Sequence, residues 1–289
     1  MKILTLTAAA MLAFATNSVL ARFALSAGDI DPLAFTGIRL VSGATVLALI
    51  VSIRSGVFVR PNLTTSWWGA LSLLAYATTF SIAYVMVGAG PGALILFASV
   101  QFSMVAWAIF KGDRPAALEW FGMIIALLAL VYLVSPGLSA PPLRGAVLMI
   151  LAGVSWGVYS LLGRGSLAPL ADTAGNFILC APIGILLIVA GFLFFRPSGI
   201  GLTCAIASGS IASGMGYIVW YDVLPKLSRT TAAVVQLTVP AIAALGGVAL
   251  IGEFLTVRLL IAMAGIAGGV SLSLLAADRR RRTDNLAAG

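Results

Sequence analysis

Ten apolar stretches, each about as long as a bilayer is wide, fill most of this 289-residue chain. Hydrophobic residues make up 61% of the sequence and charged residues only 9%, and the mean hydropathy is +1.11. A soluble domain with this composition would have too little polar surface to face water. The sequence therefore predicts an all-α integral membrane protein.

A helix needs roughly 20 apolar residues to cross about 30 Å of hydrocarbon. Dividing the sequence at its charged, glycine-rich and proline-rich breaks predicts spans near residues 4–25, 32–53, 66–87, 91–111, 116–134, 145–163, 170–194, 199–222, 230–251 and 256–276. The connections are too short for a soluble domain, so we expect the functional groups to lie within the helix bundle. The first span also resembles a cleaved signal peptide, but it occupies the place in its half that residues 145–164 occupy in the other.

The last five predicted spans repeat the first five. Gly112 and Gly252 are 140 residues apart; each is followed by an acidic residue, and each pair closes one apolar stretch and opens the next. Arg22 and Arg164, 142 residues apart, each close the first span of their half.

An odd number of spans in each half implies that the two halves enter the membrane from opposite sides. We therefore predict two inverted five-helix repeats, residues 1–137 and 138–289, around a central cavity. Inverted repeats in transporters place the substrate site at their interface and open it to either face. The alternative is a repeat that only supports a larger complex.

Basic residues are distributed unequally between the two predicted faces. The side of the N-terminus receives twelve of the 17: Lys2, Arg54, Arg60, Lys111, Arg114, Arg164, Lys226, Arg229 and Arg279 to Arg282. The other side receives Arg22, Arg39, Arg144, Arg196 and Arg258. This bias predicts that both termini are cytoplasmic, in a bacterial inner membrane.

The net charge of +8 is then a topology signal with a basic tail held to anionic lipid headgroups. No nucleic-acid recognition motif accompanies the basic residues, so no nucleic-acid partner is expected.

The sequence lacks the residues that several kinds of chemistry require. The sequence has no histidine, and its two cysteines, Cys180 and Cys204, fall inside predicted spans, so neither a metal site nor a structural disulfide is expected. No ATP-binding loop is present. The acids are scattered rather than clustered, which disfavours a membrane enzyme acting on lipids. We therefore expect no enzymatic activity and no cofactor.

The same acids bear on energy coupling. Proton pumps usually keep a carboxylate or histidine near the bilayer centre. Here every acid lies near a span end or outside the spans. This pattern predicts gradient-driven transport or exchange, or proton coupling by an indirect route.

The C-terminal sequence closely resembles the second EamA domain of the drug/metabolite transporter superfamily. The features that carry this resemblance are Trp220-Tyr221 with Leu224, the small residues 228–233, Gln236, Pro240 and Gly252-Glu253. The first domain is matched by residues 17–22, Asp31-Pro32, Arg39, 93–101 and 112–114. Two departures are Phe14-Ala15, where the family often has Trp-Gly, and Asp113, where Glu is commoner.

The resemblance implies a basket of ten helices with a cavity lined by spans one to four and six to nine, with spans five and ten at the side. It also implies function, because many members export amino acids and other small metabolites across the inner membrane.

Polar residues inside the spans are candidate substrate ligands, because an unpaired polar group in hydrocarbon is costly. Arg39 lies about two turns into its span, roughly 10 Å deep at 1.5 Å per residue. Its guanidinium can hold a carboxylate by two hydrogen bonds, or it can anchor the fold by reaching toward the interface. The others are Asn17, Gln101, Asn176 and Gln236, which can bind substrate or join helices.

Aromatic residues supply further candidates. Trp156 and Tyr159 lie mid-span and three residues apart on one helical face, where their polar atoms need partners. Tyr84 and Tyr217 are added to this substrate-binding set. Pro240 removes one hydrogen-bond donor from its span and is predicted to bend it near the site; a static kink that only shapes packing is the alternative.

Taken together, these features predict an exporter of small organic metabolites that works by alternating access. Amino acids are the expected substrates, with aromatic or bulky apolar ones favoured. Alternative cargoes are nucleosides or drugs, and the other alternative is a lipid-handling membrane protein. The expected partners are the small-molecule substrate and membrane lipids, and the expected assembly is a monomer or weak homodimer.

Overall fold

The structure of this chain is a computed structural model that describes residues 2–55, 63–112, 114–135, 140–163, 166, 168–227 and 235–287. Within these ranges the regular elements are all helical. They are α1 (Lys2–Ser26), α2 (Pro32–Ser55), α3 (Leu63–Met86), α4 (Ala89–Phe110), α5 (Ala117–Val134), α6 (Leu143–Gly163), α7 (Pro169–Phe194), α8 (Gly199–Ala207), η1 (Ser208–Met215), α9 (Gly216–Val223), η2 (Leu224–Lys226), α11 (Thr238–Ile251) and α12 (Val257–Ala287).

The helices agree closely with the predicted spans. In the described part of the chain, nine helical segments are long and apolar enough to cross a bilayer, with α8, η1 and α9 forming one of them. The first eight predicted spans match these segments to within three residues at either end. The ninth corresponds to the shorter apolar helix α11, and residues 230–234 of that prediction lie outside the described residues. The predicted domain boundary at residues 137 and 138 also lies outside them.

The last helix extends beyond its predicted span. The prediction of 256–276 agrees with the apolar part of α12, Val257–Ala277, and the helix then continues to Ala287. Hydropathy marks where hydrocarbon ends, whereas a helix can continue into water because its hydrogen bonds are internal. Contact with α5 supports the extension, since Arg280 Nε donates to Glu119 Oε1 over 2.7 Å.

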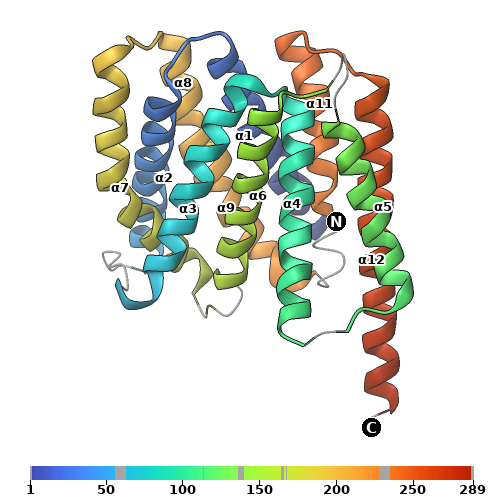
Figure 1. The fold of residues 1–289 in the computed structure, drawn as a ribbon. Helices are drawn as coiled ribbons and strands as arrows, with labels where there is room; N and C mark the ends of the chain where they lie inside the picture. Colours follow the sequence, from blue (N-terminus) through green and yellow to red (C-terminus); the bar gives the residue numbers. More distant parts are fainter. Residues whose placement is uncertain are drawn as a thin grey trace.

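The helices form two groups (Figure 1). The main group contains α1 to α4 and α6 to α11, with α2 packed along α7, α3 along α6, and α1 against α8, η1 and α9. The second group is the pair of α5 and α12, which contact each other extensively and lie at one side of the main group.

Facing glycines let the backbones approach where these helices cross. A Cβ added to Gly122 of α5 would lie 2.5 Å from the carbonyl oxygen of Gly269 in α12, and a Cβ on Gly269 would lie 2.5 Å from the carbonyl of Gly122. On α2 and α7, a Cβ on Gly37 would lie 2.3 Å from the carbonyl oxygen of Gly184. Close packing of small residues is how helices associate in lipid, where no hydrophobic effect drives them together.

The segment from residue 199 to residue 223 is not a uniform α-helix. Its middle, η1, is a π-helix of small residues, a class of irregularity often found at functional sites. Gly209 allows η1 to touch α2, because a Cβ there would lie 2.2 Å from the carbonyl oxygen of Arg39. The irregular segment is therefore held directly against Arg39, which is the most deeply buried arginine among the residues whose burial the structure describes.

Candidate functional site

A cavity lies in the middle of the main group, between α1, α2, α3, α4, α6, η1 and α9. Its lining residues are Phe14, Asn17, Ser18, Arg39, Tyr76, Phe80, Leu96, Phe97, Trp156, Ala212, Ser213 and Tyr217. The volume of the cavity is only about 20 Å³. One water needs roughly 10 to 15 Å³ by this measure. A larger ligand thus requires the side chains or helices to move apart.

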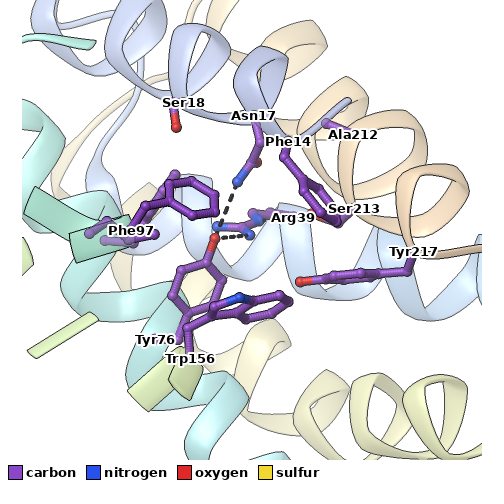
Figure 2. A pocket seen from close by; sticks show the side chains of 12 residues that line it. Phe14, Asn17, Ser18, Arg39, Tyr76, Phe97, Trp156, Ala212, Ser213 and Tyr217 are labelled. Carbon is purple, nitrogen blue, oxygen red and sulfur yellow. Dashed lines mark hydrogen bonds between the residues drawn. The ribbon is translucent and has the colours of Figure 1, made fainter. Parts of the chain in front are cut away.

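Arg39 provides the charge of the cavity (Figure 2). It is 1% exposed, its Nε donates to Ser213 Oγ over 3.3 Å, and its Nη2 donates to Tyr76 Oη over 3.1 Å. Its guanidinium also lies 4.8 Å from the centre of the Phe80 ring. Among the described residues no carboxylate pairs with it, and its Nη1 has no hydrogen-bond partner. A cation is thus held in a water-poor site with one donor unused.

Tyr76 connects this charge to α1. Its hydroxyl oxygen accepts from Arg39 and also from Asn17 Nδ2, over 3.4 Å (Figure 2). Asn17 Oδ1 in turn accepts from Ser208 Oγ over 2.6 Å. Four helical segments, α1, α2, α3 and η1, therefore meet in one chain of hydrogen bonds.

Aromatic rings form one wall of the cavity. The indole of Trp156 lies 5.0 Å from the ring of Tyr76, 5.3 Å from Tyr159 and 5.3 Å from Tyr217, centre to centre. The plane of the indole is inclined by only 27° to the ring of Tyr159 and by 18° to the ring of Tyr217, so the rings are stacked. Phe14 packs against Tyr217 from the α1 side, with ring centres 6.0 Å apart. These rings offer a flat apolar surface beside the cation.

A second polar pair lies beyond this wall. The Asn176 Nδ2 of α7 donates to the hydroxyl oxygen of Tyr159 on α6 over 3.4 Å, and both residues are buried. Neither lines the central cavity. Trp156 separates the pair from the hydrogen-bonded cluster around Arg39, since its indole contacts both Tyr76 and Tyr159.

The structure brings four of the ten predicted ligands to the cavity: Asn17, Arg39, Trp156 and Tyr217. Tyr84 and Gln101 are buried in α3 and α4 without lining it, like Tyr159 and Asn176. Gln236 lies just before α11, also away from the cavity.

Pro240 lies in the first turn of α11, and the helical pattern is interrupted at Leu237, three residues earlier. Its position is consistent with the missing donor of proline. It lines a separate apolar crevice between α4, α11 and α12, together with Leu94, Met263 and Ile266 among others. The break is therefore present, but Pro240 does not face the central cavity.

Several lining residues were not predicted from the sequence. Tyr76 is the most important of them, since it accepts hydrogen bonds from two different helices. Like Trp156, Tyr76 is an aromatic residue in mid-span whose polar atom needs a partner, so the sequence did carry a signal for it. Ser213, Phe80 and Phe97 carried no comparable signal, because serine and phenylalanine are common in membrane helices.

Comparison with known proteins places this chain among transporters. A model of the EamA-like transporter family matches residues 143–275. The uncharacterized protein PA1977 of Pseudomonas aeruginosa is 46% identical over 273 residues, which cover 94% of each chain. The uncharacterized transporter YwfM of Bacillus subtilis is 28% identical over 276 residues, or 90% of each chain.

Two further similarities are more distant. The threonine/homoserine exporter RhtA of Escherichia coli is 31% identical over 170 residues, which are 56% of each chain. One crystal structure matches 93% of this chain and 98% of its own with a TM-score of 0.63 and 20% sequence identity. An identity this low shows that the fold is shared and carries no information on substrate.

Proposed function

Because this chain belongs to the EamA-like transporter family of the drug/metabolite transporter superfamily, we propose that it exports amino acids, with Arg39 as the ligand for their carboxylate. The chain is a multi-pass membrane transporter. Its substrate class, its mechanism and its orientation are the proposed parts.

The unpaired donor of Arg39 carries the substrate assignment. A guanidinium buried without a counter-ion is costly, and its cost is reduced when an anion enters the site. Nη1 is free while Nε and Nη2 hold Ser213 and Tyr76. A carboxylate is the anion that the planar donor set of arginine fits best among metabolite groups, apart from phosphate.

The aromatic wall favours larger side chains within this class. Trp156 and Tyr217 present stacked rings beside the cation, and stacking contributes beyond simple apolar burial. An aromatic or bulky apolar amino acid can place its carboxylate on Arg39 and its side chain on this wall. The relative RhtA exports threonine and homoserine, which supports amino acids as a class and leaves the side-chain preference to the site.

Alternating access of an inverted repeat is the proposed mechanism. The helix contacts support it: α2 pairs with α7 and α5 with α12, as elements on an axis between two repeats would. The facing glycines of these two crossings are each 147 residues apart, at Gly37 with Gly184 and Gly122 with Gly269. Gly112, just after α4, and Gly252, at the end of α11, both have positive φ, 93° and 73°. Similar halves that cross the bilayer in opposite senses can exchange conformations around one site.

The orientation follows from the charge bias of the sequence. We propose that both termini lie in the cytoplasm of a bacterial inner membrane, so that the loops joining α1 to α2, α3 to α4 and α11 to α12 face outward. We call this side the outer face.

Counterflow in proteoliposomes tests the proposal. Vesicles loaded with unlabelled substrate should accumulate the same substrate in labelled form, with phenylalanine, leucine, threonine, phenylethylamine and uridine as the panel. We expect exchange of phenylalanine and leucine and little of phenylethylamine, which has the ring and amine of phenylalanine but no carboxylate. Arg39→Met should remove this discrimination, because it keeps most of the side-chain length and loses the charge.

Arg258→Met is the matched control. Arg258 is also on the outer side of the protein, but it contacts Tyr132 of α5 and Ser135, which follows α5, away from the cavity. It should exchange substrates like the wild type. Wild-type protein that moves no amino acid would refute the substrate class, and exchange of uridine alone would favour a nucleoside exporter. If Arg39→Met still exchanged phenylalanine in preference to phenylethylamine as the wild type does, this result would refute the role of Arg39.

A further inference from the structure

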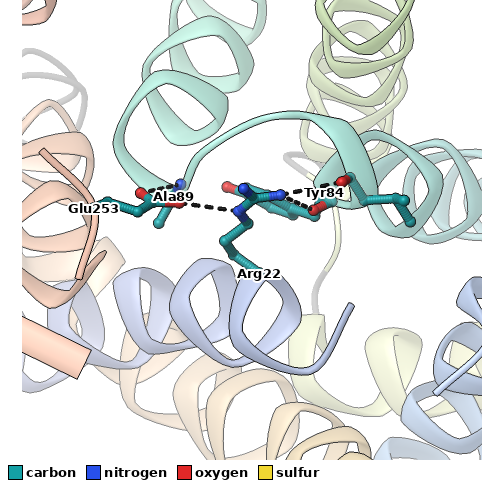
Figure 3. A network of polar contacts seen from close by, with 5 residues as sticks. Arg22, Tyr84, Ala89 and Glu253 are labelled. Atoms are coloured by element: carbon teal, nitrogen blue, oxygen red, sulfur yellow. Dashed lines mark hydrogen bonds and ion pairs between the residues drawn. The ribbon is translucent and has the colours of Figure 1, made fainter. Parts of the chain in front are cut away.

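Arg22 of α1 joins three other parts of the protein (Figure 3). Its Nε donates to Glu253 Oε1 over 2.9 Å, and its Nη1 donates to the carbonyl oxygens of Tyr84 and Val85, over 3.0 and 3.1 Å. Glu253 Oε2 accepts from the backbone N–H of Ala89 over 2.9 Å. This Arg22–Glu253 network thereby connects α1, the end of α3, the start of α4 and the loop between α11 and α12.

Local backbone geometry explains why Glu253 reaches this position. Gly252 ends α11 with a φ of 73°, a left-handed conformation that glycine adopts without steric cost. The next N–H, that of Glu253, then donates back to the carbonyl of Gly247. Gly247 also leaves room for the carboxylate, because a Cβ there would lie 2.7 Å from Glu253 Oε2. The glutamate is thus held by its backbone as well as by Arg22.

The network lies one helical turn beyond the cavity. Arg22 follows the lining residue Ser18 by four positions, and Tyr84 follows the lining residue Phe80 by four. Residues four apart lie on the same face of a helix, here about 6 Å further along it. Arg22 therefore lies on the same face of α1 as Ser18, and it meets the backbone of α3 one turn beyond Phe80.

We propose that the Arg22–Glu253 network is the outer gate of the transport pathway and that it is closed in this structure. The proposal rests on the transport function proposed above. Opening breaks the ion pair and the hydrogen bonds from Arg22 to the carbonyls of Tyr84 and Val85, so that α1 separates from the α3–α4 turn and from the loop after α11. Substrate bound near Arg39 then reaches the outer face between α1, α3 and α4.

The exposure of the two side chains fits a contact that opens and closes. Arg22 and Glu253 are 20% and 19% exposed, so water can solvate both charges when they separate. A fully buried pair would leave unsolvated charges on opening. Arg258 and Arg280 differ from Arg22, because they bind Ser135, which follows α5, and Glu119 of α5 at the side of the bundle.

Thiol accessibility tests the gate without any substrate. Ser18→Cys is placed in a chain whose native Cys180 and Cys204 are replaced by serine. A membrane-impermeant maleimide is then applied to the outer face. We expect slow labelling in this parent and at least tenfold faster labelling once Glu253→Gln or Arg22→Gln is added. Arg258→Gln is the control and should leave the rate unchanged. Equal rates in the parent and in both gate variants would overturn the proposal.

Cross-linking provides the reverse test in case a gate variant folds poorly. Cysteines at positions 22 and 253 (Arg22→Cys with Glu253→Cys) are joined by a short, reducible, bifunctional thiol reagent. We expect counterflow to fall at least tenfold and to return after reduction. The control tether uses Ser135→Cys with Arg258→Cys, which joins α5 and α12 on the same face away from the cavity.

If protein cross-linked between positions 22 and 253 exchanged substrate as fast as protein with the control cross-link, this result would also overturn the gate proposal. Failure of the transport proposal gives a different result. In that case wild-type protein exchanges nothing on the panel, whereas the labelling of Ser18→Cys still responds to Glu253→Gln.

Discussion

At the scale of single residues, the central feature is a cation whose surroundings are neutral. Arg39 is stabilised by the hydroxyl oxygens of Tyr76 and Ser213 and by the faces of Tyr76 and Phe80. Hydroxyl groups and π faces lower the cost of a buried charge without neutralising it. This neutral environment is the basis of our proposal that the cavity binds an anionic substrate group.

Tyr76→Phe removes one hydroxyl and keeps the ring. The substitution deletes the acceptor shared by Arg39 and Asn17, so the guanidinium loses its fixed orientation. Hydrogen bonds to charged groups contribute about 1.5 to 3 kcal/mol, and we expect the apparent affinity for phenylalanine in counterflow to fall roughly tenfold or more. Tyr132→Phe, at an exposed position of α5, is the control. Unchanged affinity would show that Tyr76 does not position Arg39.

Trp156→Phe alters the aromatic wall and retains an aromatic ring. Trp156 stacks on Tyr159 and Tyr217, and aromatic pairs contribute about 0.5 to 1.5 kcal/mol beyond their burial. We expect the preference for phenylalanine over leucine to fall about two- to tenfold, measured as a ratio of exchange rates so that protein amount cancels. Trp68→Phe, exposed at the start of α3, should leave the ratio unchanged. An equal ratio in Trp156→Phe would place the ring-binding surface elsewhere.

At the scale of elements, the π-helix η1 determines the shape of the site. It contributes Ala212 and Ser213 to the cavity and Ser208 to the hydrogen bonds of Asn17. Its wider winding changes which residues face α2, compared with an uninterrupted α-helix. The small residues of the segment from 208 to 215 allow the close approach, and Gly209 is the tightest point.

Gly209→Ala should therefore destabilise the protein. The added Cβ would lie 2.1 Å from Ser42 Oγ and 2.2 Å from the backbone oxygen of Arg39, which cannot move freely. Overpacking of this kind costs about 1 to 3 kcal/mol, and we expect a lower melting temperature in detergent together with weaker exchange. Gly268→Ala in α12 is matched to it, because nothing lies within 4 Å of the added Cβ. That control should be neutral or slightly stabilising. Equal melting temperatures for both variants would contradict the packing of η1 against α2.

At the scale of the whole molecule, the main group surrounds the cavity and the α5–α12 pair stands beside it. Polar contacts hold the pair together toward both ends, at Arg258 with Ser135 and at Arg280 with Glu119. Small residues close the contact between these ends. In the described part of the chain, the pair meets the main group chiefly at α4, beside the apolar crevice that α4, α11 and α12 share.

Orientation is a property of the whole molecule and is tested by labelling from one side. Arg196→Cys lies between α7 and α8, and Lys111→Cys follows α4 on the opposite face; both positions are exposed. In intact cells an impermeant maleimide should label Arg196→Cys, whereas Lys111→Cys should react only after permeabilisation. The reverse pattern would mean that the termini are outside, and would turn the proposed gate toward the cytoplasm.

Much of the architecture could be read from the sequence. Span positions follow from hydropathy because each helix satisfies its own backbone in lipid, whatever its neighbours are. Arg39, Asn17 and Trp156 could be found because a polar or amphipathic group in mid-span needs a partner. The span of α12 could be predicted, but its continuation to Ala287 could not, because hydropathy locates the membrane and not the end of a helix.

The tertiary structure alone decided which partner each polar group has. Hydropathy sets the position of a residue along its helix, but helix rotation and crossing set what it faces. For this reason Tyr76 became the shared acceptor, Gln101 and Pro240 turned away from the cavity, and Arg22 met Glu253 across 231 residues of sequence. Span positions depend on one helix and the lipid around it, whereas the cavity depends on contacts among at least six helices.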